Sequence, residues 1–200
     1  MPVFQTAKRR YVGNVARTKG VSFINVRAFG LERAGESGWQ RVLGELSASE
    51  RDELATVVAV GWYDLGLYAR LIRNVDRVLG SGNLMLLREL GRFEADRDLT
   101  TVHRLFIRMA SPAWVIEKTM EYWRRFHDTG QWKVHRESGQ AVTGTLAGWG
   151  VVDEALCVEL TGYMPRVVEL AGARSAQMAH PSCRARGDQS CDFRLSWDAG

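Results

Sequence analysis

Apolar residues recur at helical spacing through the middle of the chain, between residues 47 and 130. The recurring positions are Trp62, Leu65, Ala69, Ile72 and Leu79, and later Ile116, Met120 and Trp123. Side chains three or four residues apart lie on the same face of a helix, so each set predicts a helix with one buried face. We therefore expect residues 47–130 to be mainly helical.

Capping signals mark where these helices begin and end. Ser47 and Glu50 have the spacing of a capping box, in which each side chain satisfies a free backbone N–H group. Ser111 followed by Pro112 predicts a second helix start, because proline at the first helical position gives up no hydrogen bond. The turn-forming stretch 80–83 predicts a helix end between them.

After residue 130 the apolar period shortens to two, which is typical of strands. Residues 132–137 and 141–146 predict a hairpin turned at 137–140, and a helix follows at about 157–171. One face of the last segment is apolar, formed by Cys191, Phe193, Leu195 and Trp197. With a strand near 174–180, this segment predicts a second hairpin.

Together these elements predict an α+β fold, with helices packed on one side of a small antiparallel sheet that ends in a C-terminal β-hairpin. We find no flexible linker or internal repeat, so we expect a single domain over residues 1–200. Within it we distinguish a basic N-terminal arm at 1–31, a mainly helical part at 47–130 and a hairpin–helix–hairpin at 131–197.

Length and composition agree with an ordinary globular domain. The chain has 200 residues, of which 46% are hydrophobic and 25% charged. Its apolar runs are shorter than the roughly 20 residues that a membrane-spanning helix needs. The first ten residues lack the apolar stretch and cleavage site of a secretory signal. We therefore expect a cytoplasmic protein.

The net charge of +4 is unevenly distributed. Residues 1–31 hold six basic residues and no acidic one; removing those six from the 27 basic residues leaves 21 against 23 acidic ones. A basic arm favours contact with nucleic acid or an acidic membrane surface, but no recognition helix or stacking motif accompanies it. We therefore favour an arm whose basic residues pair with the acidic remainder, and keep the other reading as an alternative.

The three cysteines lie late in the chain, at positions 157, 183 and 191. An odd number fits a disulfide framework poorly. The loop between Cys183 and Cys191 can bring both sulfur atoms to one point, and His180 and Cys157 add an imidazole and a third thiol. Three thiolates and an imidazole form a closed structural zinc site. Buried free thiols and a Cys183–Cys191 disulfide remain as alternatives.

These residues resemble a known family. Cys157, Gly162-Tyr163, His180-Pro-Ser-Cys183, Gly187 and Cys191-Asp-Phe193 resemble the 4-vinyl reductase domain, of the nitric-oxide-signalling and Golgi-transport ligand-binding superfamily. Stretches at 88–93, 110–112 and 122–124 also resemble uncharacterised myxobacterial members. In the aromatic-sensing members, zinc is held by cysteine, an acidic residue and two further cysteines at this spacing. The chain departs from them at His180, which is still a good zinc ligand.

The resemblance also implies a cavity between the helices and the sheet that holds a small hydrophobic or aromatic molecule. Candidate lining residues, chosen by rough position, are His103, Phe106, Tyr122, Trp123 and Trp132. Aromatic residues at helical spacing more often belong to an ordinary core, and we favour that interpretation of them. Asp96, Asp98 and His103 resemble acid–base groups, but on a helix they are better explained as a cap and a solvated face.

We find no nucleophile with a spaced base, so the sequence does not indicate an enzyme. It favours a zinc-stabilised sensor or scaffold domain in bacterial signalling, which by analogy is a homodimer and acts through an output partner protein. The first alternative is a ligand-free interaction subunit like the vesicle-tethering relatives. The second is an accessory protein of a tetrapyrrole reductase.

Overall fold

The computed structural model describes residues 15–99 and 110–199. Its first part contains β1 (Arg17–Lys19), α1 (Gly20–Gly44), α2 (Ala48–Ala55), β2 (Trp62–Asp64), α3 (Leu65–Leu79) and α4 (Leu86–Asp98). Its second part contains α6 (Pro112–Glu121), the 3-10 turn η1 (Tyr122–Arg125), β3 (Gln131–Ser138), β4 (Ala141–Ala147), α7 (Glu154–Leu170), β5 (Arg174–Ser182), the 3-10 turn η2 (Arg184–Arg186) and β6 (Cys191–Asp198).

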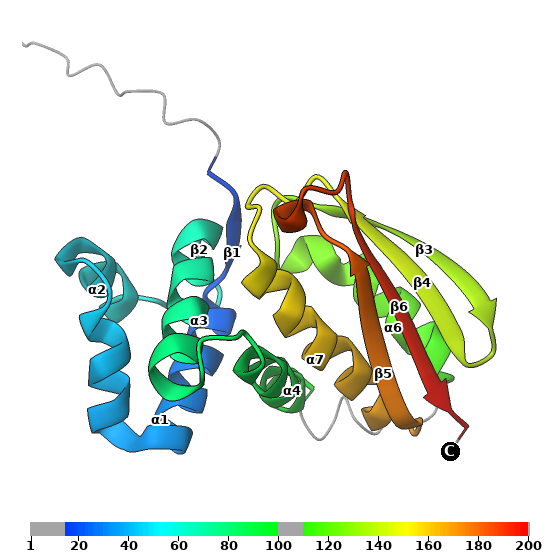
Figure 1. The fold of residues 1–200 in the computed structure, drawn as a ribbon, viewed down its shortest axis with the longest axis horizontal. Helices are drawn as coiled ribbons and strands as arrows, with labels where there is room; N and C mark the ends of the chain where they lie inside the picture. Colours follow the sequence, from blue (N-terminus) through cyan, green and yellow to red (C-terminus); the bar gives the residue numbers. More distant parts are fainter. Residues whose placement is uncertain (1–14, 100–109, 200) are drawn as a thin grey trace, which may run out of the picture.

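The predicted α+β class is confirmed. Strands β3, β4, β6 and β5 form an antiparallel sheet in that order, and β1 pairs with β2 in a second, two-stranded sheet. Helix α7 lies between the four-stranded sheet and the group formed by α1, α3 and α4 (Figure 1). The apolar face predicted for β6 is buried, and the residues between alternate toward solvent. Helices thus cover one side of the sheet.

Both predicted caps are present. The Ser47 side chain accepts the Glu50 N–H, and the Glu50 carboxylate accepts the Ser47 N–H at 2.8 Å. Ser111 caps α6 by accepting the Trp114 N–H at 3.3 Å. The later helix begins earlier than expected, at Glu154, because the side chain of Asp153 accepts the Ala155 N–H at 2.8 Å. This start places Cys157 inside the first helical turn.

Two glycines let α4 and α7 cross at close range. A Cβ atom on Gly91 would lie 2.2 Å from the Glu159 carbonyl oxygen, and one on Gly162 would lie 2.0 Å from the Arg88 carbonyl oxygen. Each glycine therefore accepts the backbone of the opposite helix where any side chain would collide with it. This contact sets the position of α7 relative to the helical layer.

The described part of the basic arm is mostly helical. From residue 20 onward it belongs to α1, and Phe23, Val26 and Phe29 of that helix are buried in the core. The sequence analysis did not predict this helix. Lys8, Arg9 and Arg10 lie outside the described residues. Within the described ranges, we find no helix with the length and apolar character to cross a membrane.

Candidate metal centre and ligand cavity

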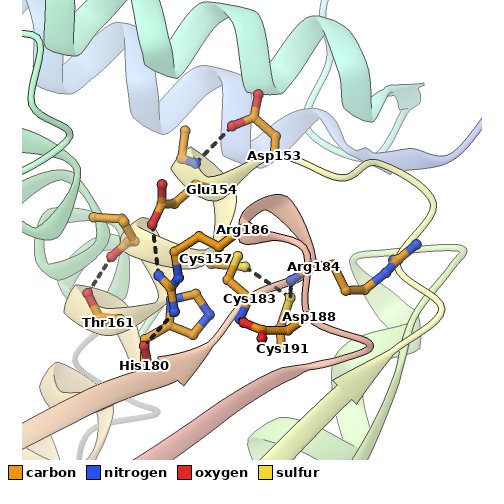
Figure 2. Close-up of polar contacts among 12 residues, drawn as sticks. Asp153, Glu154, Cys157, Thr161, His180, Cys183, Arg184, Arg186, Asp188 and Cys191 are labelled. Atoms are coloured by element: carbon orange, nitrogen blue, oxygen red, sulfur yellow. Dashed lines mark hydrogen bonds and ion pairs between the residues drawn. The ribbon is translucent and has the colours of Figure 1, made fainter.

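The structure brings together the four residues predicted as metal ligands. Cys157 comes from the first turn of α7, His180 from β5, Cys183 from the residue after β5, and Cys191 from the start of β6. One ligand atom from each lies within 4.8 Å of all the others. Figure 2 shows the side chains converging where the end of the β5–β6 hairpin meets α7.

The loop between the last two cysteines is held by its own hydrogen bonds. The Asp188 carboxylate accepts the Cys183 N–H at 2.7 Å, and the Cys183 carbonyl accepts the Arg186 N–H at 2.8 Å. Gly187 has a φ of +98°, which permits this turn. The Arg184 N–H points at the Cys191 sulfur at 3.4 Å (Figure 2). The loop therefore presents both sulfur atoms and supplies a donor to one of them.

Arg186 ties this loop to the other two elements. Its guanidinium donates to Glu154 of α7 at 2.8 Å and to the His180 carbonyl oxygen of β5 at 2.9 Å. The three segments that carry the cluster are thus held together by charged and backbone groups as well as by any metal.

The sulfur atoms are free and close, but not bonded. All three cysteines are buried and unpaired, and the Cys157 and Cys191 sulfurs are 3.6 Å apart. A disulfide requires about 2.05 Å. Burial and the neighbouring sulfurs raise the pKa of the Cys157 thiol, because two further anions would be unfavourable at this spacing. A bound cation reverses that preference. The geometry suits three thiolates sharing one metal ion.

His180 is in the protonation state that a metal requires. Its ring stacks on Phe193 with centroids 4.4 Å apart, and burial lowers its pKa to about 4. The imidazole is therefore neutral at neutral pH. Its Nε2 atom is buried with no hydrogen-bond partner among the described residues. A neutral imidazole with an unpaired ring nitrogen, in a residue beside three thiols, is available to bind a metal ion.

A separate cavity of about 200 Å³ lies between the helical layer and α7. Tyr122 and Trp123, two of the predicted lining residues, border it. Trp132 is not among the described lining residues; it packs edge-on behind Trp123 at a centroid distance of 5.7 Å. His103 and Phe106 lie outside the described residues.

One end of this cavity is aromatic. Trp123 stacks on His127 at 4.0 Å, and Trp149 packs edge-on against Trp123 at 5.1 Å. The Trp123 indole donates to the Thr129 carbonyl oxygen at 2.8 Å. Burial lowers the pKa of His127 to about 3, so its ring is neutral. This end of the cavity is therefore aromatic and uncharged, which suits an apolar or aromatic molecule.

The other end is acidic, which the sequence analysis missed. The Tyr68 hydroxyl contacts Glu94 at 3.1 Å and also contacts Glu159. All three side chains are buried. Burial raises the pKa of both carboxyl groups and of Tyr68. Repulsion by Glu159 adds to the effect on the pKa of Glu94, and repulsion by Asp98 adds to the effect on the pKa of Glu159. The sequence signal that could have identified them is a glutamate among the apolar residues of each helix, Glu94 in α4 and Glu159 in α7.

Asp98 extends this acidic end. The expectation that it lies on a solvated helix face is therefore wrong. Its carboxylate accepts from the Asn25 amide at 2.8 Å and from the Tyr163 hydroxyl at 3.2 Å. Asn25 in turn accepts from Arg97 at 3.0 Å. Burial raises the pKa of Asp98. The side chain faces the interior because α1 and α7 both pack against the end of α4.

No family model matches this chain, and no curated protein does. Solved structures match over nearly the whole chain. An H-NOX protein from S. oneidensis in the Fe(II)NO ligation state has a TM-score of 0.69 and 13% identity, covering 90% of this chain and 99% of that one. An Fe(II) unliganded H-NOX protein from K. algicida has a TM-score of 0.66 and 11% identity, covering 91% and 97%.

A third solved structure is an IWP-051-bound H-NOX from Shewanella woodyi, with a TM-score of 0.63 and 12% identity, covering 88% of this chain and 93% of that one. The fold is thus that of H-NOX proteins. At these identities the likeness establishes the fold alone.

Proposed function

We propose that this chain is a zinc-stabilised domain that senses a small hydrophobic or aromatic molecule. The position of α7 carries the proposal. Its first turn supplies Cys157 to the metal cluster, and the turns after it supply Leu160 and Met164 to the cavity wall. A ligand that alters the packing of α7 therefore acts on the helix that the metal centre anchors. Two H-NOX neighbours, described as Fe(II)NO-ligated and IWP-051-bound, support a ligand-binding role for this fold.

The zinc ion in this proposal is structural. Cys157, His180, Cys183 and Cys191 would fill all four tetrahedral positions, which leaves none open for water or substrate. The ion would fix α7 to the β5–β6 hairpin through bonds that the short loop alone does not supply. The same ligand set supports kinship with the 4-vinyl reductase domains. The stretches at 88–93, 110–112 and 122–124 are the basis for proposing kinship with the myxobacterial members.

Heme is an alternative ligand for this fold, because one similar solved structure is described in terms of heme redox potential and porphyrin distortion. The described residues do not fit it. The cavity volume is about 200 Å³, below the roughly 300–1,000 Å³ of pockets that bury drug-sized ligands. Its polar end carries Glu94, Asp98 and Glu159, which would repel the propionates of a heme.

The remaining expectations form part of the proposal. We infer a non-enzymatic domain, since the carboxyl groups of the cavity contact tyrosines and one another rather than a nucleophile. We also propose that it acts in the cytoplasm as a homodimer through an output partner. The rival interaction subunit without a ligand requires a solidly filled core, which the cavity disfavours. The reductase accessory role requires room for a tetrapyrrole, which the cavity lacks.

Native mass spectrometry of the purified full chain tests the proposal. We expect one zinc ion per chain, a dimer, and a co-purified small molecule or a cavity that accepts an added aromatic one. His180→Ala should lose zinc, whereas His135→Ala, on the exposed face of β3, should keep it. A metal-free wild-type chain with three titratable thiols would overturn the zinc assignment. Failure of every small aromatic compound to bind would overturn the sensing role.

A further inference from the structure

Within residues 15–99 and 110–199, the buried acidic end of the cavity has no balancing cation. Glu94 is 5% exposed and Glu159 is 7% exposed. Among the described residues, no arginine or lysine contacts either carboxyl group; their partners are Tyr68 and each other. Buried carboxylates are normally paired with a cation or kept neutral. Arg97 donates to Asn25 and lies over the Phe93 ring, and no hydrogen bond joins it to either glutamate among the described residues.

The hydrogen bonds can be satisfied only if the pair holds a proton. The Tyr68 hydroxyl has one hydrogen but contacts an oxygen of each glutamate. It can donate to one carboxylate, and the second contact then needs a proton on the other carboxyl group. This agrees with the raised pKa of both glutamates. The protein thus keeps a carboxyl group protonated at a position where a cationic ligand could neutralise the carboxylate instead.

The aromatic end limits the shape and size of the ligand that the cavity can hold. The cavity also borders Trp123, His127 and Trp149, so an aromatic ring can pack against these side chains while its substituent reaches the glutamates. A dry cavity of about 150 Å³ accepts benzene. A cavity of about 200 Å³ therefore accommodates one six-membered ring with a short side chain.

Two polar atoms of the aromatic wall have no partner in the described part of the chain. They are Nε1 of Trp149, whose side chain is only 5% exposed, and Nδ1 of His127. Both residues line the cavity. Buried polar groups in native proteins are almost always hydrogen-bonded. Because both atoms are buried within the wall itself, they mark its polar groups and do not by themselves identify the ligand.

We propose that the cavity binds a single-ring aromatic amine, with its ring against Trp123 and Trp149 and its ammonium group on the Glu94–Glu159 pair. This inference rests on the proposed sensing function and names its ligand class. On binding, the carboxyl O–H bond of the pair breaks and its proton passes to the solvent. The ammonium group keeps its own protons and donates them to the two carboxylates and to the Tyr68 oxygen.

Isothermal titration calorimetry with three matched probes tests the ligand class on the full-length zinc-loaded protein. The probes are 2-phenylethylamine, 2-phenylethanol and 3-phenylpropionate, which share a ring and differ in the charge of the side chain. An opposite charge beside a carboxyl group shifts its pKa by about 1–3 units, which corresponds to an affinity preference of about 10- to 1,000-fold. We expect the amine to bind at least tenfold more tightly than the alcohol, with proton release, and the acid to bind weakest.

Variants locate the preference. Glu94→Gln and Glu159→Gln should each bring the affinity for the amine toward that for the alcohol. Glu53→Gln, on the exposed surface of α2, should leave the preference unchanged. The wild-type comparison is decisive even if a cavity variant does not fold. Equal affinity for amine and alcohol, or tighter binding of the acid, would overturn the amine assignment while leaving aromatic sensing intact. No binding of any probe would overturn both.

Discussion

The crossing of α4 and α7 can be tested by adding one methyl group at Gly162. Its Cβ atom would lie 2.0 Å from the Arg88 carbonyl oxygen and 2.7 Å from the Arg88 carbonyl carbon. Both are backbone atoms of a regular helix, so neither can rotate away. Reaching the 3.4 Å of ordinary contact requires α4 and α7 to separate by about 1.4 Å, the difference between 3.4 and 2.0 Å. Because α7 carries both Cys157 and the cavity wall, that shift would reach both sites.

The expected magnitude follows from two opposing effects. Overpacking a well-packed contact costs about 1–3 kcal/mol, and a rigid backbone obstacle favours the upper end. Replacing a helical glycine by alanine returns about 1 kcal/mol through helix propensity. We therefore expect Gly162→Ala to destabilise the protein by about 2 kcal/mol. In a domain of this size that lowers Tm by about 4–8 °C.

The assay is urea and thermal unfolding of the zinc-loaded chain, followed by circular dichroism. Gly44→Ala is the matched control, since a Cβ atom there at the end of α1 meets nothing within 4 Å. That variant should be neutral or slightly more stable. If Gly162→Ala is as stable as Gly44→Ala, the close helix crossing is not the constraint that positions α7, and the reasoning is refuted.

Three further predictions concern the cavity. Glu94→Gln should be more stable than wild type at pH values above the ordinary carboxyl pKa of 4.5. The difference in the free energy of unfolding should grow by up to about 1.4 kcal/mol per pH unit, because a carboxyl group whose folded pKa is raised loses its stabilising contribution as pH rises. A difference that narrows with pH in urea titrations would contradict this. Tyr68→Phe removes the hydroxyl group that contacts two buried carboxyl groups and should cost about 1–3 kcal/mol, whereas Tyr122→Phe, at a half-exposed ring, should cost almost nothing. Equal unfolding midpoints of the two variants would refute this expectation. His127→Phe should reduce the loss of stability between pH 6.5 and about 3, since the buried neutral ring takes up its proton only on unfolding in that range; acid unfolding curves of unchanged steepness would show that the ring is not responsible.

Local chemistry made much of the fold predictable. A capping box depends on two residues three positions apart, so Ser47 and Glu50 predict the start of their helix without any tertiary information. The alternation from Cys191 to Trp197 likewise fixes which face of β6 is buried. Helix α1 was missed because Gly35, at a φ of +63°, breaks its regular course and its apolar residues do not form one continuous stripe.

The candidate site divides in the same way. The four metal-ligand candidates were found because their residue types are specific and three of them lie within twelve residues of one another. The acidic end of the cavity was not found, because a buried glutamate is tolerated only through its partners. Glu94 and Glu159 lie 65 positions apart, on helices whose crossing depends on Gly91 and Gly162. Nothing local distinguishes such residues from glutamates on a solvated helix face.

X-ray absorption at the zinc edge of the purified chain tests the central claim most directly. The account predicts a four-coordinate ion with three sulfur ligands at about 2.3 Å and one nitrogen ligand at about 2.0 Å. In the His180→Ala variant the nitrogen shell should be lost or replaced by oxygen. A spectrum with oxygen ligands only, or with fewer than three sulfurs in the wild-type protein, would contradict the assignment of Cys157, His180, Cys183 and Cys191 as one metal centre.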